Sequence, residues 1–129
     1  MISEFTDLKA WQEAHKLTLL VYQVTDRFPK SELYGLTSPL RRAVVSVESC
    51  VAEGFCRFHY KDRLNFYYEA RGSLGEVESQ IFDARDLKFI RDNDFKLIWE
   101  QAEKVSVVLG GLIRSPKLCR RDKFCYNYS

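Results

Sequence analysis

Hydrophobic residues recur at steps of three and four through four segments of the chain, which is the period of an amphipathic α-helix. In the first two segments these apolar stripes are Ala10, Ala14, Leu17, Val21, Val24 and Phe28, then Leu40, Ala43, Val44, Val47, Cys50 and Val51. In the last two they are Phe66 or Tyr67, Ala70, Leu74, Val77, Ile81 and Ala84, then Phe95, Ile98, Ala102, Val105, Leu109 and Leu112. The sequence therefore predicts four helices.

Proline, glycine and capping residues predict where these helices begin and end. Ser38 followed by Pro39 is typical of a helix N-terminus, and Gly54 of a C-terminal stop. Pro29 ends the first helix and Pro116 forbids continuation of the last. The short connection over residues 55–60 makes the second and third helices antiparallel neighbours.

The third helix is expected to be the longest, from Lys61 to about Ile90, and it contains two glycines. Glycine is a poor helix former, so a mid-helix glycine usually marks a close backbone approach or a kink. We interpret Gly72 and Gly75 as a tight crossing with another helix, with a kink as the alternative.

Together these elements predict an all-α, antiparallel up-down-up-down four-helix bundle over residues 1–115, followed by a short C-terminal tail over 116–129. The first helix is apolar on more than one side because Trp11, Leu20 and Tyr22 lie off its stripe. A helix of that kind needs several neighbours to cover it. We therefore expect the bundle to assemble into a ring-like homo-oligomer.

Composition restricts the function classes. The chain has 129 residues, enough for one domain, and a net charge of +2, so nucleic-acid binding would require local clusters of basic residues. It contains no run of 18 apolar residues, and acidic residues near its start argue against a secretory signal. We expect a cytoplasmic protein that makes no contact with a membrane.

Basic residues gather in two places. Around the second turn lie Arg57, Lys61 and Arg63, with Phe55, Phe58 and Tyr60 among them; towards the end lie Arg114, Lys117, Arg120, Arg121 and Lys123. Cations interleaved with aromatic rings suit single-stranded nucleic acid, because rings stack on bases while cations meet phosphates. The alternatives are a solvated bundle end and a tail that docks on its own or a neighbouring subunit.

A third group joins Arg41 and Arg42 of the second helix to Glu76 and Glu78 of the third. If the turn centres near residue 58, Arg42 falls opposite residues 74–78, which favours ion pairs within or between subunits. The alternative is that the two guanidinium groups face a phosphate backbone.

No arrangement of reactive residues indicates an enzyme, a metal site or a cofactor site. The four cysteines, Cys50, Cys56, Cys119 and Cys125, have neither zinc-finger nor redox-pair spacing, so we expect reduced thiols. A metal site built from Cys56, His59 and the tail cysteines is the less favoured alternative.

Several motifs resemble those of the 23S rRNA intervening-sequence proteins, a family first noticed inside insertions in bacterial ribosomal RNA genes. The matching motifs include Phe5-x-Asp7-Leu8-x-x-Trp11, Val21-Tyr22, Phe28-Pro29, Tyr34-Gly35-Leu36, Leu40-Arg41-Arg42-Ala43, Val45-Ser46-Val47, Ala52-Glu53-Gly54, Arg57 and Ala70-Arg71-Gly72-Ser73-Leu74, with Glu76 and Glu78 following. The chain departs from the family at Cys50, where the family usually has asparagine, a residue able to make an interhelical hydrogen bond. The family's proline before it is also absent.

The resemblance implies a four-helix bundle that forms homopentamers and has no established activity. A more distant resemblance, to accessory proteins of diversity-generating retroelements, implies a nucleic-acid enzyme such as a reverse transcriptase, and RNA or DNA, as partners. Fold analogy raises such an expectation without demonstrating it. We therefore expect a non-catalytic, nucleic-acid-associated accessory factor. The alternative is a protein-interaction scaffold that binds no nucleic acid.

Overall fold

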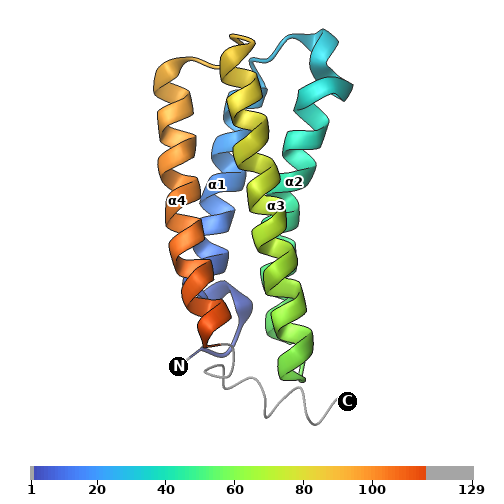
Figure 1. Cartoon of the computed structure of the whole chain (residues 1–129), viewed down its shortest axis with the longest axis vertical. Helices are drawn as coiled ribbons and strands as arrows, with labels where there is room; N and C mark the ends of the chain where they lie inside the picture. Colours follow the sequence, from blue (N-terminus) through green and yellow to red (C-terminus); the bar gives the residue numbers. More distant parts are fainter. Residues whose placement is uncertain (1, 116–129) are drawn as a thin grey trace.

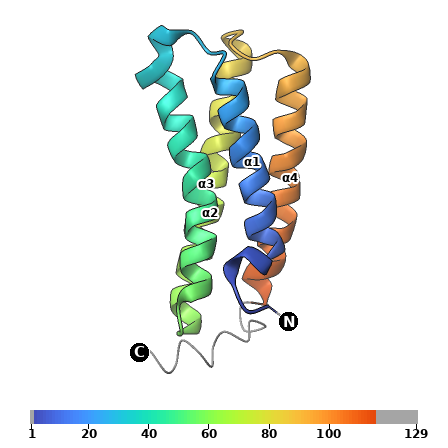
Figure 2. The same ribbon diagram turned by 180° about the vertical axis from the view of Figure 1, so that it is seen from behind.

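The computed structural model describes residues 2–115, and in this part of the chain four α-helices and no strands are found. The helices are α1 (Lys9–Thr25), α2 (Ser38–Cys56), α3 (Tyr60–Asp86) and α4 (Asp92–Arg114). They lie side by side along the long axis of the molecule (Figures 1 and 2). Three short helices complete the description: the 3₁₀ helices η1 (Phe5–Asp7) and η2 (Lys30–Glu32), and the π-helix η3 (Leu33–Thr37).

The four helices enclose a hydrophobic interior made of two clusters of buried residues. The main contacts are α1 with α2, α2 with α3, α3 with α4 and α4 with α1, so each helix has two neighbours. Most predicted stripe residues are buried, including Leu17, Val47, Leu74 and Ile98, each at most 1% exposed. The periodicity of the sequence therefore identified the four helices and the faces that they bury.

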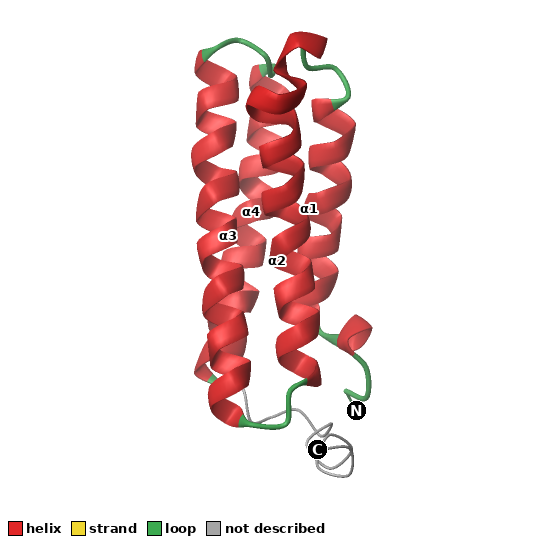
Figure 3. Cartoon of the chain, turned by 90° about the vertical axis from the view of Figure 1, so that its right-hand side faces the viewer, coloured by secondary structure: helices red, strands yellow, loops and turns green. Residues whose placement is uncertain are grey.

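Several predicted helix ends are wrong. The first helix ends at Thr25, before Pro29, because the backbone tightens into i→i+3 turns in which Arg27 N donates to Val24 O. Ser38 begins α2 but does not cap it, because η3 runs directly into α2 and Thr37 takes the N-cap position, where no side chain caps the helix. Figure 3 shows this extra helical turn at the α1–α2 end of the molecule.

Gly54 does not stop the second helix, which continues to Cys56. It is buried, and a Cβ built there would lie 2.6 Å from Cε1 of Tyr67 and 3.0 Å from Cβ of Phe66. The missing side chain therefore makes room for Tyr67 of α3. The close approach predicted at glycine residues of α3 is found at this glycine of α2.

Gly72 and Gly75 do not mark a crossing within the chain. Both are exposed, and a Cβ at either would meet nothing within 4 Å. The third helix also ends earlier than predicted, at Asp86, where Phe89 N donates to Ala84 O at 2.8 Å and Lys88 adopts a left-handed conformation with φ 64°. These are features of a Schellman-type helix end.

Polar bonds link α2 to α3 around the hydrophobic interior. Ser46 Oγ and Ser73 Oγ are 2.9 Å apart, and the Cys50 thiol donates to Glu69 Oε2 at 3.7 Å. Cys50 thus makes a weak interhelical contact. No helix in the described part of the chain is both long and apolar enough to cross a membrane.

Candidate nucleic-acid interface

One end of the molecule carries the described members of both predicted basic clusters. Arg57 is the residue after α2, Lys61 lies in the first turn of α3 and Arg114 is the last residue of α4. Leu112 and Ile113 pack against a cluster that includes Phe55 and Tyr67, which brings the end of α4 to the α2–α3 turn. All three basic side chains are exposed. The structure therefore places them at one end of the bundle (Figure 1).

Arg57 is partly engaged by its neighbours. Its Nη2 lies 3.4 Å from Glu53 Oε2, and its guanidinium carbon lies 4.9 Å from the centroid of the Phe66 ring. Both members of this ion pair are at least half exposed, so the pair contributes little to stability. The arrangement holds a solvent-facing cation over an aromatic ring.

Arg63 was predicted to contact nucleic acid, and the structure contradicts this. Its side chain is only 1% exposed, and its Nε donates to the backbone carbonyl oxygen of Arg57 at 2.8 Å. A guanidinium inside the turn satisfies a carbonyl that the end of α2 leaves without a helical partner. Arg63 therefore fixes the α2–α3 turn and offers no surface to a phosphate.

The aromatic residues of this turn are only partly available. Phe55 is fully buried, so it cannot stack on a base. Phe58 is half-buried with its ring 5.0 Å from that of His59, whereas Tyr60 is 41% exposed. Fewer of these cations and aromatic rings are therefore exposed in the fold than the sequence pattern predicts. Lys117, Arg120, Arg121 and Lys123 lie outside the described residues.

Arg41 and Arg42 do not pair with Glu76 or Glu78 within one chain, as far as residues 2–115 show. Arg41 turns to α1, where its Nε donates to Thr25 Oγ1 at 2.8 Å and its guanidinium lies 4.7 Å from the centroid of the Tyr22 ring. The predicted pairing between subunits stays a prediction. The prediction failed on direction, because it placed the arginines on the face of α2 that meets α3, whereas Arg41 points to α1.

Glu76 and Glu78, the predicted partners of these arginines, form no ion pair among the residues that the structure describes. Burial, and then the nearby charge of Glu103, raise the pKa of Glu78 above its ordinary value. Glu76 is exposed. Glu78 therefore lies near a like charge of α4 and forms no ion pair with α2 in the described part of the chain.

An unpredicted polar cluster joins α1 to α2. His15 Nδ1 lies 2.9 Å from Glu48 Oε2, and the Trp11 ring stacks on the imidazole with centroids 4.7 Å apart. Phe5 of η1 packs edge-on against Trp11 at 5.4 Å. The spacing of Trp11 and His15 by one helical turn could have revealed their stacking, but Glu48 is distant in sequence. The cluster fastens the N-terminal segment to the bundle.

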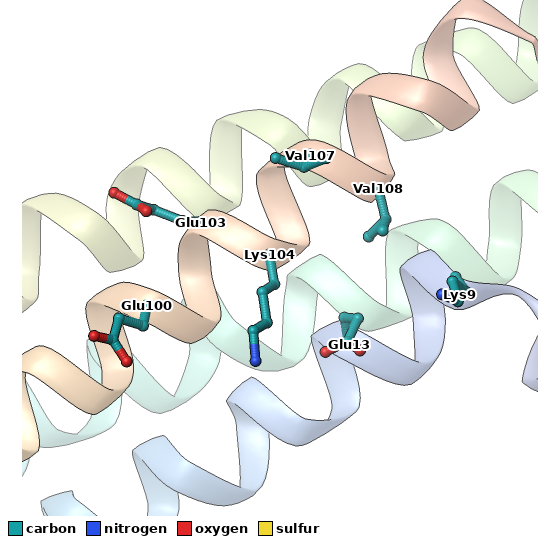
Figure 4. Close-up of a pocket in the computed structure, with 7 residues that line it drawn as sticks. All are labelled: Lys9, Glu13, Glu100, Glu103, Lys104, Val107 and Val108. Carbon is teal, nitrogen blue, oxygen red and sulfur yellow. The ribbon is translucent and has the colours of Figure 1, made fainter.

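A groove of about 550 Å³ follows α1 and α4 (Figure 4). Its charged lining is Lys9, Glu13, Glu100, Glu103 and Lys104, and its apolar lining is Val107 and Val108. Gln101 Nε2 donates to Glu13 Oε2 at 2.7 Å and is the main cause that lowers the pKa of Glu13. Lys104 extends from α4 towards α1 in Figure 4. The mixture of charges favours a solvated surface over an anion site.

Among residues 2–115, no group of three or more histidine, cysteine, aspartate and glutamate side chains is placed to hold a metal ion. Cys50 is half-buried, and burial is the main cause that raises the pKa of its thiol. Cys119 and Cys125, which the alternative metal site would need, lie outside the described residues.

The fold and its surface define a small all-α protein built from four helices, with the exposed residues Arg57, Lys61 and Arg114 at one end. The chain belongs to the 23S rRNA-intervening sequence protein family, which matches residues 6–111. No curated protein matches the chain. The family match bears on this family alone, so the resemblance to retroelement accessory proteins, and the reverse transcriptase that it implies, stay predictions.

Proposed function

We propose that the protein is a non-catalytic, homo-oligomeric accessory protein of the cytoplasm that contacts RNA or DNA with its basic end. In this proposal an up-down-up-down bundle assembles into a closed ring, and a pentamer is the size that the family resemblance implies. The bonds Ser46–Ser73 and Cys50–Glu69 support the antiparallel course of α2 and α3, because the partner residue number falls by four as the first rises by four.

Exposed apolar side chains carry the self-association part of the proposal. Leu19 of α1 is 57% exposed, and Leu97 and Val107 of α4 are 54% and 71% exposed. Scattered apolar residues are normal on a monomer, but these side chains lie on two neighbouring long helices that a second copy of the chain would cover together. Light scattering should give a mass several times that of the 15.2 kDa chain. A monomeric mass at micromolar concentration would reject this part.

The basic end carries the nucleic-acid part. Arg57, Lys61 and Arg114 lie together on it, and a symmetric ring would repeat the set in each subunit, so weak contacts would add through multivalency. Contacts of this kind recognise phosphate with little sequence discrimination. The name of the family refers to an rRNA intervening sequence, which makes RNA the first nucleic acid to test.

Electrophoretic shifts across a salt series test this directly. Binding to a single-stranded RNA should weaken steeply as salt rises, and it should weaken further in Arg57→Ala and Lys61→Ala. A triple variant of Arg120, Arg121 and Lys123 tests the tail in the same way. Lys30→Ala is the matched control, because Lys30 is an exposed lysine of η2 at the other end of the molecule.

A protein-interaction scaffold is the second candidate, and the exposed apolar residues support it equally. The two candidates differ in the salt series. Absence of RNA and DNA binding at low salt, or binding that neither salt nor these substitutions alter, would favour the scaffold over the nucleic-acid accessory factor.

A further inference from the structure

A second, separate concentration of positive charge lies in the shallow groove between α1 and α2. The groove has a volume of about 360 Å³ and is lined by Tyr22 of α1 and by Ser38, Arg41, Arg42 and Val45 of α2. Its lining includes two guanidinium groups and two hydroxyl groups but no carboxylate. The groove between α1 and α4, by contrast, mixes lysine with glutamate side chains.

Arg41 is held in a fixed position in this groove. Its Nε donates to Thr25 Oγ1 at 2.8 Å, and the Thr25 hydroxyl in turn donates to Val21 O at 2.7 Å. The guanidinium also lies over the Tyr22 ring, 4.7 Å from the centroid. These contacts engage the Nε atom of Arg41 and restrict the rotation of its guanidinium. Binding of an anion by the Nη atoms therefore costs little further conformational entropy.

Neither arginine of this groove is neutralised by an acid in the part of the chain that the structure describes. Arg42 is exposed, and neither it nor Arg41 takes part in an ion pair there. Asp26, the residue after α1, forms no ion pair with either guanidinium. Glu48, two turns further along α2, is engaged by His15.

We propose that this groove binds a phosphate group, with Arg41 and Arg42 as charged donors and the Ser38 hydroxyl as a neutral one. Phosphate fits because its tetrahedral oxygens accept hydrogen bonds from several directions, which two guanidinium groups and a hydroxyl can supply. Inorganic phosphate, a phosphomonoester and an RNA backbone offer this same chemistry. The last of these sources rests on the proposed nucleic-acid function; the other two do not.

The site is distinct from the basic end of the bundle. Arg57, the residue after α2, lies fifteen positions beyond Arg42, which corresponds to about 22 Å along a helix. A single phosphate therefore cannot contact both places, whereas an extended strand of RNA can. Phosphate binding in the groove and RNA binding at the basic end can accordingly be lost independently.

Titration of the full-length protein into inorganic phosphate, followed by ³¹P NMR line width at constant ionic strength, tests the site. The wild type should broaden the signal saturably, and Arg42→Ala should weaken that binding about tenfold by removing one charge-assisted contact. Arg41→Lys keeps the charge but loses the fork and its position over Tyr22, so it should weaken binding as well.

Arg71→Ala is the matched control. Arg71 is exposed like Arg42, and its guanidinium lies over a tyrosine ring as that of Arg41 does, 5.3 Å from the centroid of Tyr68. Its removal therefore makes the same change in charge away from the groove. It should leave phosphate binding unchanged. Absence of saturable broadening in the wild type, or equal weakening in Arg71→Ala and Arg42→Ala, would overturn the proposal.

RNA binding and light scattering of Arg42→Ala distinguish the sources of the phosphate and test whether a second copy of the chain occupies the groove instead. Weaker RNA binding in Arg42→Ala would assign the groove to a nucleic-acid backbone. Phosphate binding without RNA binding by any variant would leave this site standing while the proposed function failed. A lower mass of Arg42→Ala in light scattering, without any phosphate-dependent broadening, would instead assign the groove to carboxylates of a second copy and reject the phosphate site.

Discussion

At the scale of single residues, the fold decides the role of each basic side chain. Lys61 and Arg63 are two positions apart in the sequence, yet Lys61 is exposed and Arg63 is buried against the α2–α3 turn. Residues two apart on a helix point in different directions, so one can face the interior while the other faces solvent. A cluster of positive charges in a sequence therefore overstates the positive surface that the fold presents.

Replacing Arg63 tests its structural role. Arg63→Ala removes the bond from Nε to the carbonyl oxygen of Arg57, and hydrogen bonds that involve charged groups contribute about 1.5–3 kcal/mol. We expect the free energy of unfolding to fall by about this amount in a urea titration. Lys61→Ala, the exposed neighbour, should change stability by no more than about 0.5 kcal/mol. Equal stability of the two variants would contradict a structural role for Arg63.

The raised pKa of Glu78 predicts a pH-dependent effect. Because burial and Glu103 raise its pKa in the folded state, the contribution of Glu78 to stability is fully present below its ordinary value of 4.5 and is lost as pH rises through the folded pKa. Glu78→Gln should therefore stabilise the protein at pH 7, by up to about 0.5 kcal/mol, and lose that advantage near pH 4.

Denaturant titrations at the two pH values measure this effect. Glu76→Gln is the control, because it makes the same chemical change at an exposed neighbouring position of α3. A gain from Glu78→Gln that is as large at pH 4 as at pH 7 would show that relief of the charge is not its cause.

At the scale of helices, glycine position controls how closely α2 and α3 approach. Gly54 lies under Tyr67 with no space for a Cβ, whereas Gly72 and Gly75 face open space. The same residue type thus has opposite effects: one glycine allows packing, and the other two lower the helix propensity without a packing benefit inside the chain.

A pair of glycine-to-alanine substitutions distinguishes these roles. Gly54→Ala should destabilise the protein, because overpacking costs about 1–3 kcal/mol and exceeds the gain of about 1 kcal/mol in helix propensity. Gly72→Ala should stabilise it by about 0.5–1 kcal/mol. Thermal unfolding of both variants provides the measurement. If Gly72→Ala instead destabilises the protein and lowers its mass in solution, a second copy packs closely on α3 at this glycine.

The sequence predicted the parts of the fold that depend on periodicity alone. The four apolar stripes were sufficient for the helices and their buried faces, because a helix must bury a stripe wherever its ends lie. The ends themselves depended on interactions that no local pattern shows, such as η3 before Ser38 and the Tyr67 ring beside Gly54. The burial of Arg63 at the candidate site could not be predicted for the same reason, since its bond to the Arg57 carbonyl exists only once the turn has formed.

At the scale of the whole molecule, each of the four helices buries one side, and α1, α3 and α4 leave large apolar side chains exposed on the other. Leu19, Tyr68, Leu97 and Val107 are exposed on three different helices. If copies of the chain cover some of these side chains, part of the stability of the fold depends on assembly. Stability would then follow protein concentration as well as sequence, because an assembled subunit is favoured by mass action.

Thermal unfolding over a range of protein concentrations tests this dependence. For a homo-oligomer, the midpoint temperature should rise as the concentration increases from about 1 to 100 μM, because unfolding is coupled to dissociation. Single lysine substitutions of Leu19, Tyr68, Leu97 and Val107 locate the interface. On an exposed position of a monomer, each should change stability by less than about 0.5 kcal/mol, so a variant that loses the concentration dependence identifies a covered face. A wild-type midpoint independent of concentration, together with a monomeric mass, would contradict the ring and leave the bundle to act alone.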